Sequence, residues 1–341
     1  MNLSDFDYDL PENFIAQTPL EPRDASRLLS LNRSDGALTH AAFHDLPRYL
    51  RPGDVLIFND TRVIPARLFG TKTDTGGRVE LLMLKRRAPL VWEVLIGGKA
   101  HTGMVLKIEG HDELEAVVMQ EFGGARRLVQ FSQPISPLLE QVGHVPLPPY
   151  IHGPLSNRER YQTVYAKVSG SAAAPTAGLH FTPELLAKLM VLDVQLGYVT
   201  LHIGLDTFAP VKEEQVEEHP MHGEWCEVAE DTAALVNTAK REGRRVIAVG
   251  TSAVRTLESA QQGAQVGQTI AEMSGMTDLY ILPGHRFRVA DAMITNFHLP
   301  RSTLLMLVSA FAGREKILAA YETAKQQGYR FYSFGDAMLI E

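Results

Sequence analysis

The sequence predicts an α/β main domain that carries a small inserted antiparallel β-barrel. Two patterns lead to this fold class: short β-like runs separated by Gly pairs between about residues 68 and 131, and strands that alternate with helices after about residue 180. The length of 341 residues corresponds to roughly two domains at about 150 residues each. We therefore expect a discontinuous α/β catalytic domain at 1–67 and 146–341, and an inserted β-barrel domain at 68–145.

The composition is that of an ordinary globular chain, with 45% apolar and 21% charged residues and a net charge of −7. These values exclude disorder, collagen and coiled coil. The negative charge argues against nonspecific nucleic-acid binding but leaves room for a local basic patch. Cys226 is the only cysteine, which excludes an intramolecular disulfide and Cys-rich zinc sites.

The N-terminus lacks the basic region of a signal peptide, because several acidic residues precede the first basic one. The longest apolar run, 303–312, is far shorter than the roughly 20 residues that a membrane-spanning helix needs. We expect a cytoplasmic enzyme without a membrane segment.

Runs at 78–84, 91–96, 104–108, 114–119 and 127–131 predict the strands of the inserted module. Short strands at regular spacing with Gly turns are typical of a barrel or sandwich. After them, 137–142 fits a short helix that ends at Gly143, and the Pro-rich segment 146–149 forms a stiff connector.

The main domain is predicted from its strand runs and helix caps. Strands are expected at 55–58, 194–203, 245–249, 279–282 and 292–297. Thr182 before Pro183 marks a helix start, since Thr caps and Pro suits the first helical position. Further helices are expected at 253–262, from the cap Ser302 to about 311, and at 315–327, where Gly328 closes the last one.

Two segments are candidates for a ligand site. Segment 170–181 (Gly-Ser-Ala-Ala-Ala-Pro-Thr-Ala-Gly-Leu-His-Phe) has small residues that allow close approach of a ligand, and it ends at a helix start that favours an anion. A tight surface loop fits this segment equally well. In segment 249–256, a strand, a small-residue turn and a helix N-terminus follow one another, with Thr251, Ser252 and Arg255 as polar groups. Plain helix capping with a solvated Arg255 is the alternative.

Polar residues also follow three predicted strands: Asn59, Asp60 and Arg62 after the first, His202 after the second, and Asn296 with His298 after the third. Ligands gather at strand carboxyl ends in α/β sheets, so the three clusters together indicate a site.

Other chemistries lack their motifs. No G-x-G-x-x-G, P-loop or G-x-S-x-G sequence is present. His219 and His222 form an HxxH, but Pro220 disfavours a helix and no third ligand is placed by sequence, so no metal is expected. Basic clusters at 85–87, 126–127, 244–245 and 286–288 fit a solvated rim or, if aligned, a phosphate track.

The chain strongly resembles the S-adenosylmethionine:tRNA ribosyltransferase-isomerase family of queuosine biosynthesis. The resemblance runs nearly end to end, through 58–68 (FNDTRVIPARL), 143–151 (GHVPLPPYI), 161–165 (YQTVY), 172–181, 246–259, 295–304 (TNFHLPRSTL) and 329–340. The sequence departs from the family pattern at Leu205-Asp206-Thr207-Phe208, at Cys226 and at Ser252-Ala253.

The resemblance implies that S-adenosylmethionine serves as a ribosyl donor, so it is a co-substrate and no cofactor or metal is needed. The implied acceptor is the 7-aminomethyl-7-deazaguanine base at the anticodon wobble position of a tRNA. Adenine and methionine leave, and the product is epoxyqueuosine in the tRNA. The implied fold is an α/β domain with an inserted β-barrel, and we expect a monomer.

The expected reaction needs a base for the proton next to sulfur, a site for the methionine part and contacts to RNA. We expect His180, His202 and His298 as acid–base candidates, with Asp60 as a rival. The expected substrate-binding residues are Ala174, Pro175, Thr176, Gly250, Thr251, Ser252, Arg255, Asn59, Arg62 and Asn296, and the expected RNA contacts are Lys85, Arg86, Arg286 and Arg288.

Three other classes of protein stay open. A conventional S-adenosylmethionine-dependent RNA methyltransferase would show a Gly-rich loop after its first strand, which is missing here. A metal-dependent hydrolase would lose activity with chelator, and a noncatalytic tRNA-binding module would bind without turnover. The clustered polar strand ends favour an enzyme.

Overall fold

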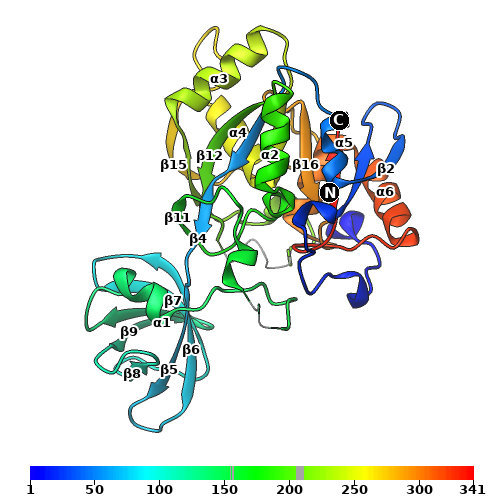
Figure 1. The fold of residues 1–341 in the computed structure, drawn as a ribbon. Coiled ribbons are helices and arrows are strands. Elements are labelled where there is room, and N and C mark those ends of the chain that lie inside the picture. The colour runs from blue at the N-terminus through cyan, green and yellow to red at the C-terminus, as the bar shows by residue number, and fades with distance from the viewer. Residues whose placement is uncertain (154, 156, 205–210) are drawn as a thin grey trace. The chain divides into compact units, whose positions relative to one another are not determined.

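The structure, a computed structural model, describes residues 1–341 except 154, 156 and 205–210 (Figure 1). The chain divides into two compact units. The first comprises Met1–Arg62, Pro149–Ser169 and Ala174–Glu341, and the second comprises Val63–Pro148 and Gly170–Ala173. The sequence analysis places these boundaries at 67/68 and 145/146. The expected fold class, an α/β domain with an inserted antiparallel β-barrel, is confirmed.

The first unit is built on a nine-stranded mixed sheet, counted over the described residues. Its order is β15 (Met273–Thr277), β13 (Glu224–Val228), β12 (Gln195–Leu201), β3 (Val55–Asn59), β14 (Val246–Val249), β16 (Ala292–Asn296), β17 (Ala337–Ile340), β1 (Arg27–Leu31) and β2 (Leu38–Ala42). The four strands from β12 to β16 run parallel, so their carboxyl ends share one edge of the sheet.

Both faces of these central strands are covered, which explains their nearly continuous apolar sequences. Val55 and Ile57 of β3 pack in one core with α3 (Glu230–Arg241), α4 (Thr251–Gln261), α5 (Thr303–Ala312) and α6 (Arg314–Gln326). Leu56 and Phe58 pack in a second core with α2 (Pro183–Val191) and the 3-10 turns η4 (Phe43–Arg48) and η7 (Thr176–His180).

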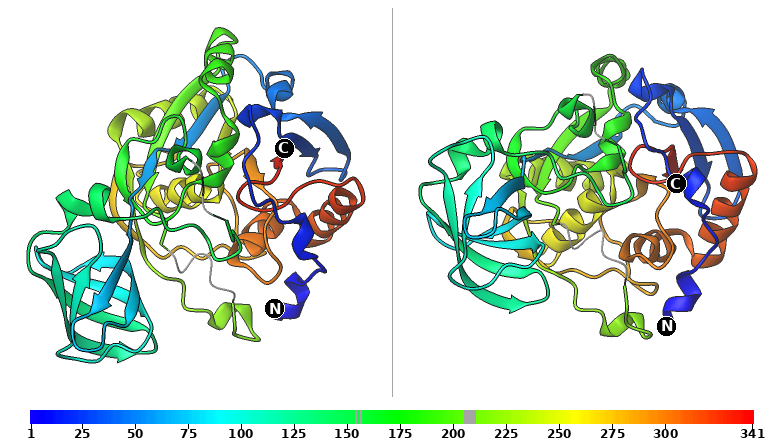
Figure 2. Two further views of the ribbon diagram at one scale, coloured as in Figure 1. Left: turned by 60° about the horizontal axis from the view of Figure 1, so that its bottom comes forward. Right: turned by 90° about the horizontal axis from the view of Figure 1, so that it is seen from below.

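The second unit is a closed antiparallel barrel, whose ring of strands is seen in Figure 2. The order is β10 (Arg126–Phe131), β7 (Val91–Gly97), β6 (Arg78–Arg86), β5 (Arg67–Lys72), β8 (Val105–Ile108) and β9 (Glu115–Gly123). Alternate residues of β6 (Val79, Leu81 and Met83) are buried in the barrel interior. The short helix α1 (Leu139–Val142) contributes two residues to the same core.

Short elements complete the described chain. These are β4 (Thr61–Val63), β11 (Val168–Ser171) and the 3-10 turns η1 (Leu3–Phe6), η2 (Glu12–Phe14), η3 (Arg23–Ala25), η5 (Ser136–Leu138), η6 (Arg158–Tyr161) and η9 (Val216–Glu218). Within the described part of the chain, no helix is long and apolar enough to cross a membrane.

The expected helix starts are confirmed by their caps. The Thr182 hydroxyl accepts a hydrogen bond from the Leu185 amide at 3.1 Å, and the Ser302 hydroxyl accepts one from the Leu305 amide at 3.2 Å. The strand expected at 279–282 is wrong: those residues form no strand, and β15 lies just before them. The apolar side chains of 279–282 lie in a loop and pack into the core that contains Val55 and Ile57.

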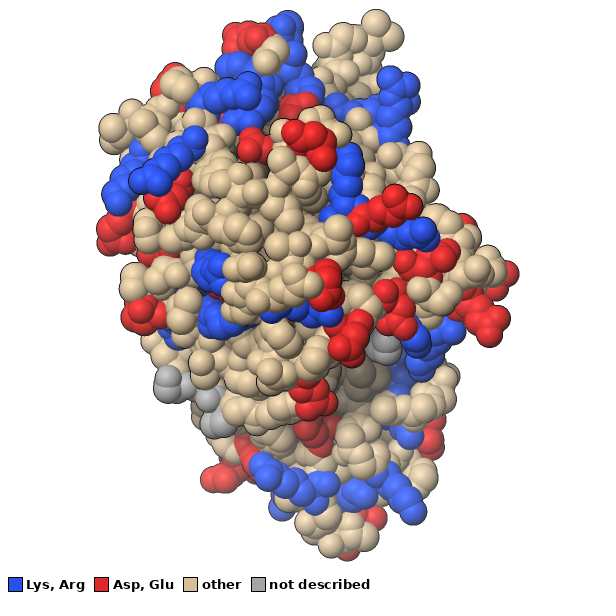
Figure 3. All heavy atoms as spheres, turned by 90° about the vertical axis from the view of Figure 1, so that its right-hand side faces the viewer, with Lys and Arg blue, Asp and Glu red and all other residues tan. Residues whose placement is uncertain are grey.

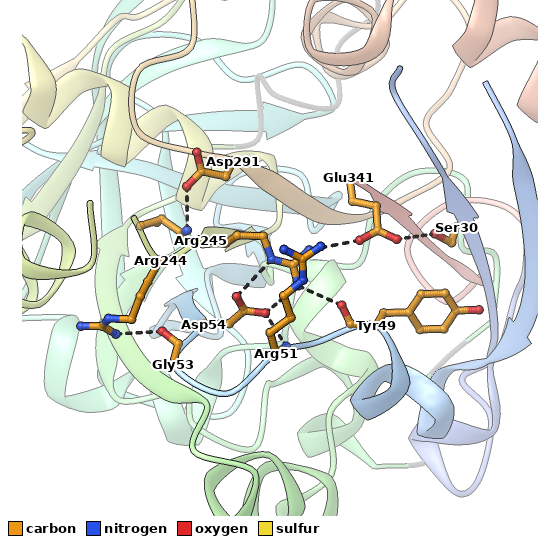
Figure 4. A network of polar contacts seen from close by, with 10 residues as sticks. Ser30, Tyr49, Arg51, Gly53, Asp54, Arg244, Arg245, Asp291 and Glu341 are labelled. Atoms are coloured by element: carbon orange, nitrogen blue, oxygen red, sulfur yellow. Dashed lines mark hydrogen bonds and ion pairs between the residues drawn. The ribbon is translucent and has the colours of Figure 1, made fainter. Parts of the chain in front are cut away.

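A polar network ties the amino ends of the central strands together (Figure 4). The Arg245 guanidinium donates to both carboxylate oxygens of Asp54, at 3.1 and 2.6 Å, and also to Glu341 and the Tyr49 carbonyl. The Ser30 hydroxyl donates to the other oxygen of Glu341. The hydrogen bond to Asp54 raises the pKa of Arg245, so the guanidinium stays charged at all ordinary pH values.

We predict that Arg245→Leu lowers the free energy of unfolding by about 3 kcal/mol, because it leaves the buried Asp54 carboxylate without its cation. The midpoint of urea unfolding measures the effect. The matched control is Arg241→Leu, an exposed arginine of α3, which should stay within about 0.5 kcal/mol of wild type. Equal midpoints for the two variants would contradict the role given to the network.

Candidate functional site

A pocket of about 620 Å³, open to solvent, lies at the carboxyl ends of the parallel strands. The segments after β12 and β14, the end of β16, and η7 all contribute to it. Its lining is Ala174, Pro175, Thr176, Ala177, Leu201, Ile203, Glu224, Gly250, Thr251, Ser252, Arg255, Thr295, Asn296, His298, Leu304, Tyr332 and Ser333. The structure thus brings together the two small-residue segments that the sequence analysis singled out and one of its three strand-end clusters.

Gly250 turns the chain from β14 into α4. Its φ of +91° lies in the region that glycine adopts readily, and its amide donates to the Ile294 carbonyl at 2.7 Å. A Cβ at this position would lie 3.6 Å from the Cβ of Ala177. The turn therefore presents Thr251 and Ser252, at the start of α4, to the pocket.

Asn59 is fully buried at the end of β3, and its side-chain amide is occupied within the chain. The nitrogen donates to the Leu201 carbonyl at 3.0 Å and to the Ser252 hydroxyl at 3.1 Å. The oxygen accepts from the amides of Leu201 and Thr61. Asn59 is not among the described residues that line the pocket; its geometry positions Ser252, which does line it.

Arg255 is buried and forms an ion pair with Glu224, so the alternative of a solvated Arg255 is wrong. Its Nε donates to the Leu279 carbonyl at 3.1 Å. Its Nη2 is buried and has no hydrogen-bond partner within the described residues. Arg255 is one of the lining residues, so a guanidinium nitrogen with unused donor capacity lies at the pocket wall.

Sequence reasoning missed Glu224, although a signal for it exists. In β13, Glu224 lies on the same buried face as Cys226 and Val228. A carboxylate on the apolar face of an alternating strand needs a buried partner, and here that partner is Arg255. The thiol of Cys226 is buried and its pKa is raised to about 11 by burial, so it is not a nucleophile at neutral pH.

Two of the expected acid–base residues lie at or next to the pocket. His298 lines it, with Nε2 at 3.2 Å from the Thr295 hydroxyl and Nδ1 at 3.3 Å from the Tyr321 hydroxyl. Burial lowers the pKa of His298 to about 3. The ring is therefore neutral at physiological pH, which is the form that a base requires.

His180 acts on the pocket through Asn296. Its Nδ1 lies 2.7 Å from the Ser26 hydroxyl, and its Nε2 lies 3.0 Å from the Asn296 amide nitrogen. Asn296 lines the pocket and accepts a hydrogen bond from the Thr176 hydroxyl at 3.0 Å. Burial, together with the charges of Arg330 and Arg23, lowers the pKa of His180 to about 3.

Asp60 and His202 lie away from this pocket. Asp60 lines a different cavity, where its carboxylate accepts a hydrogen bond from Thr200 at 2.7 Å and burial raises its pKa. The His202 ring stacks on Trp225 and lies 2.7 Å from the Thr61 hydroxyl; burial lowers its pKa. Successive strand residues face opposite sides, which separates these two from the residues that line the pocket.

The other expected site residues do not line the pocket. Arg62 forms an ion pair with Glu159 at 2.6 Å and does not line the pocket. The expected RNA contacts Lys85, Arg86, Arg286 and Arg288 are all exposed. Lys and Arg are interspersed with Asp and Glu over the face drawn in Figure 3, so no single sign covers that face. The departure at Leu205-Asp206-Thr207-Phe208 lies outside the described residues.

Among the described residues, no three His, Cys, Asp or Glu side chains gather as metal ligands. In the HxxH pair, His219 forms a 2.7 Å contact with Glu213, and both histidines line a smaller cavity that shares Glu224 with the pocket.

The fold and the pocket define an α/β protein with a pocket at its strand carboxyl ends and a β-barrel in the same chain. A family model described as queuosine biosynthesis protein matches residues 3–340. The chain therefore belongs to this family, and the resemblance stated from its motifs is confirmed.

Relatives named S-adenosylmethionine:tRNA ribosyltransferase-isomerase match over the full length of both chains. The chain is 56% identical to the protein of Carboxydothermus hydrogenoformans and 54% identical to that of Moorella thermoacetica, with 100% of each chain covered. It is also similar to the crystal structure of S-adenosylmethionine tRNA ribosyltransferase from Thermotoga maritima, with 37% identity and a TM-score of 0.58 over 99% of this chain and 100% of that one.

The two buried histidines predict a loss of stability in acid. The pKa of each is about 3 when folded, against about 6.5 when unfolded, so below about pH 6.5 only the unfolded chain takes up their protons. For each histidine, the free energy of unfolding should fall by up to about 1.4 kcal/mol for every unit by which the pH is lowered between about pH 6 and 4.5. Stability is thus present above pH 6.5 and lost as pH falls.

Urea unfolding at several pH values tests this expectation. His298→Gln should lower the slope of stability against pH by up to about 1.4 kcal/mol per unit, whatever it does to the stability at pH 7. The control His44→Gln alters an exposed ring and should keep the wild-type slope. A wild-type slope in the His298→Gln variant would show that His298 is not buried as a neutral ring.

Proposed function

We propose that this protein transfers and isomerises the ribosyl part of S-adenosylmethionine onto the 7-aminomethyl-7-deazaguanine base at the wobble position of a tRNA. Adenine and methionine are released, and the tRNA then carries epoxyqueuosine. The observation that carries the proposal is the pocket at the strand carboxyl ends, formed by small residues and the buried Arg255–Glu224 pair. The names of the full-length relatives support the same activity.

The pocket residues suit the parts of S-adenosylmethionine. Ala174, Ala177 and Gly250 leave room for a nucleoside to approach the backbone. The unpartnered Nη2 of Arg255 donates to the methionine carboxylate, as a charge-assisted hydrogen bond. The Glu224 carboxylate supplies negative charge for the methionine ammonium and the sulfonium. The zwitterionic methionine part thereby lies beside Arg255 and Glu224, whose opposite charges compensate each other.

We assign the role of base to His298 among the four acid–base candidates, because it alone lines the pocket. A base must be unprotonated, and burial keeps this ring neutral. The sulfonium makes the neighbouring carbon acidic, so a neutral imidazole can take its proton. His180 is a positioning residue that fixes the Asn296 amide through a single hydrogen bond. The acid–base roles of His202 and Asp60 stay predictions, since neither residue lines this pocket.

Further parts of the proposal concern partners and setting. Lys85, Arg86, Arg286 and Arg288 are exposed and are proposed as RNA contacts. The protein is also proposed to act as a monomer. S-adenosylmethionine is consumed, so it is a co-substrate, and no resident cofactor or metal is proposed. A tRNA substrate supports a cytoplasmic location.

A product assay tests the activity itself. The full chain is mixed with S-adenosylmethionine and tRNA that carries the aminomethyl-deazaguanine base, and small molecules and digested nucleosides are identified by mass spectrometry. We expect adenine, methionine and an epoxyqueuosine nucleoside. S-adenosylhomocysteine would instead identify a methyltransferase, and tRNA binding without turnover would identify a noncatalytic module.

The roles of the two histidines are separated by kinetics. We expect His298→Ala to lower kcat by roughly 10²- to 10⁴-fold, the usual contribution of a positioned base, with little change in tRNA affinity. His180→Gln should lower kcat less, because it disturbs only the orientation of Asn296. His44→Gln is the control for both. Equal losses of turnover and tRNA affinity in His298→Ala would assign that residue a structural role.

A further inference from the structure

A second, partly open cavity, of about 280 Å³ including its space open to solvent, lies next to the pocket and shares Ser333 with it. We name it the arginine cavity, because Arg23, Arg160 and Arg330 line it together with His180. No Asp or Glu is among its described lining residues. The three arginines come from segments far apart in the sequence, and the sequence analysis included none of them.

The charges of these arginines are poorly compensated at the cavity. Arg23 donates to the backbone carbonyls of Gln162 and Glu159, at 2.8 and 2.9 Å, and these carry no net charge. Arg160 forms an ion pair with Glu21, whose side chain is 77% exposed and so points largely into water. An anion inside the cavity would meet the Arg23 guanidinium, whose hydrogen bonds go to neutral carbonyls, and the Arg160 guanidinium, whose carboxylate partner Glu21 lies largely in water.

Arg330 has a carboxylate partner, but a shared one. Its Nη2 lies 3.4 Å from a carboxylate oxygen of Asp336. The same carboxylate also accepts hydrogen bonds from the backbone amides of Arg27 and Arg330, at 2.9 and 2.8 Å. Burial lowers the pKa of both Arg23 and Arg160, which shows that the chain holds these cations out of water at a cost. A bound anion would offset that cost.

We propose that the arginine cavity binds a phosphodiester group of the tRNA backbone beside the nucleotide that is being modified. This inference rests on the proposed function, and it specifies how the RNA is held at the same site. Planar guanidinium groups match the oxygens of a phosphate, and backbone contacts of this kind set the register of an RNA on its protein. The shared Ser333 places the phosphate next to the pocket that takes the base.

The methionine carboxylate is the other anion that the substrates bring. It differs from the phosphate in having its own donor, the unpartnered Nη2 of Arg255 inside the pocket. The arginine cavity has three cations and no lining carboxylate, so it suits a group that stays anionic under all conditions and belongs to a larger polyanion.

The test uses the full chain with the aminomethyl-deazaguanine tRNA. We expect Arg160→Gln to raise the KM for tRNA about tenfold, as loss of a charged hydrogen bond does, and to leave the KM for S-adenosylmethionine unchanged. The slope of log Kd for tRNA against log salt should become shallower by about 0.7, the value for one phosphate of a single strand. The control Arg48→Gln removes an exposed arginine, 79% exposed, and should change neither quantity.

The outcomes separate this proposal from the proposed function. No adenine or epoxyqueuosine from the wild-type protein would overturn the function itself. An active wild type with an unchanged salt slope in Arg160→Gln would overturn only the phosphate site. A raised KM for S-adenosylmethionine instead of tRNA would assign the cavity to the methionine carboxylate, and it would also overturn the phosphate site.

A second variant keeps the test valid where Arg160→Gln does not fold. Glu21→Gln removes the exposed partner of Arg160 and leaves the arginine in place. It should tighten tRNA binding, because Arg160 no longer divides its charge between Glu21 and the phosphate. Unchanged tRNA affinity in Glu21→Gln would contradict the proposal.

Discussion

The buried amide of Asn59 is the contact on which the pocket depends. A polar group without solvent must satisfy all of its hydrogen bonds within the chain, and Asn59 does so by joining β3, β12 and α4. Any ligand contact made by Ser252 is therefore fixed by a residue that does not line the pocket. The same logic holds for Asn296, which His180 and Thr176 fix from two sides.

The two edges of the central sheet serve different purposes. At the amino ends, Arg245 forms ion pairs with Asp54 and Glu341 (Figure 4). These side chains link the segments that lead into β3 and β14 to the end of β17. At the carboxyl ends, glycine and alanine leave a hollow, and the Arg255–Glu224 pair keeps a guanidinium nitrogen unused within the described residues. The ion pairs thus lie at the edge opposite the pocket, and the carboxyl ends, where ligands of α/β sheets bind, are left open.

Local signals in the sequence are sufficient for the fold class, for the barrel strands other than β5 and for the helix caps, because Thr182 and Ser302 act on amides three residues away. Strand pairing between distant segments leaves no such signal, so the sequence predicts none of β1, β2, β13, β15 and β17, and it predicts a strand at 279–282 where none forms. The strand-end clusters indicated the correct edge of the sheet. Their alternation across its faces, which separates Asp60 and His202 from His298, needed the structure.

The arginine cavity and the pocket are electrostatically linked through His180. Arg330 and Arg23 both disfavour a proton on this ring, so an anion in the cavity would weaken their effect. Burial is nevertheless the larger cause of the lowered pKa, and it persists when RNA is bound. His180 therefore stays neutral, its Nε2 continues to accept from Asn296, and the amide keeps its orientation toward Thr176. On the proposal made above, the pocket is thus arranged before RNA arrives, and binding of the phosphate leaves it undisturbed.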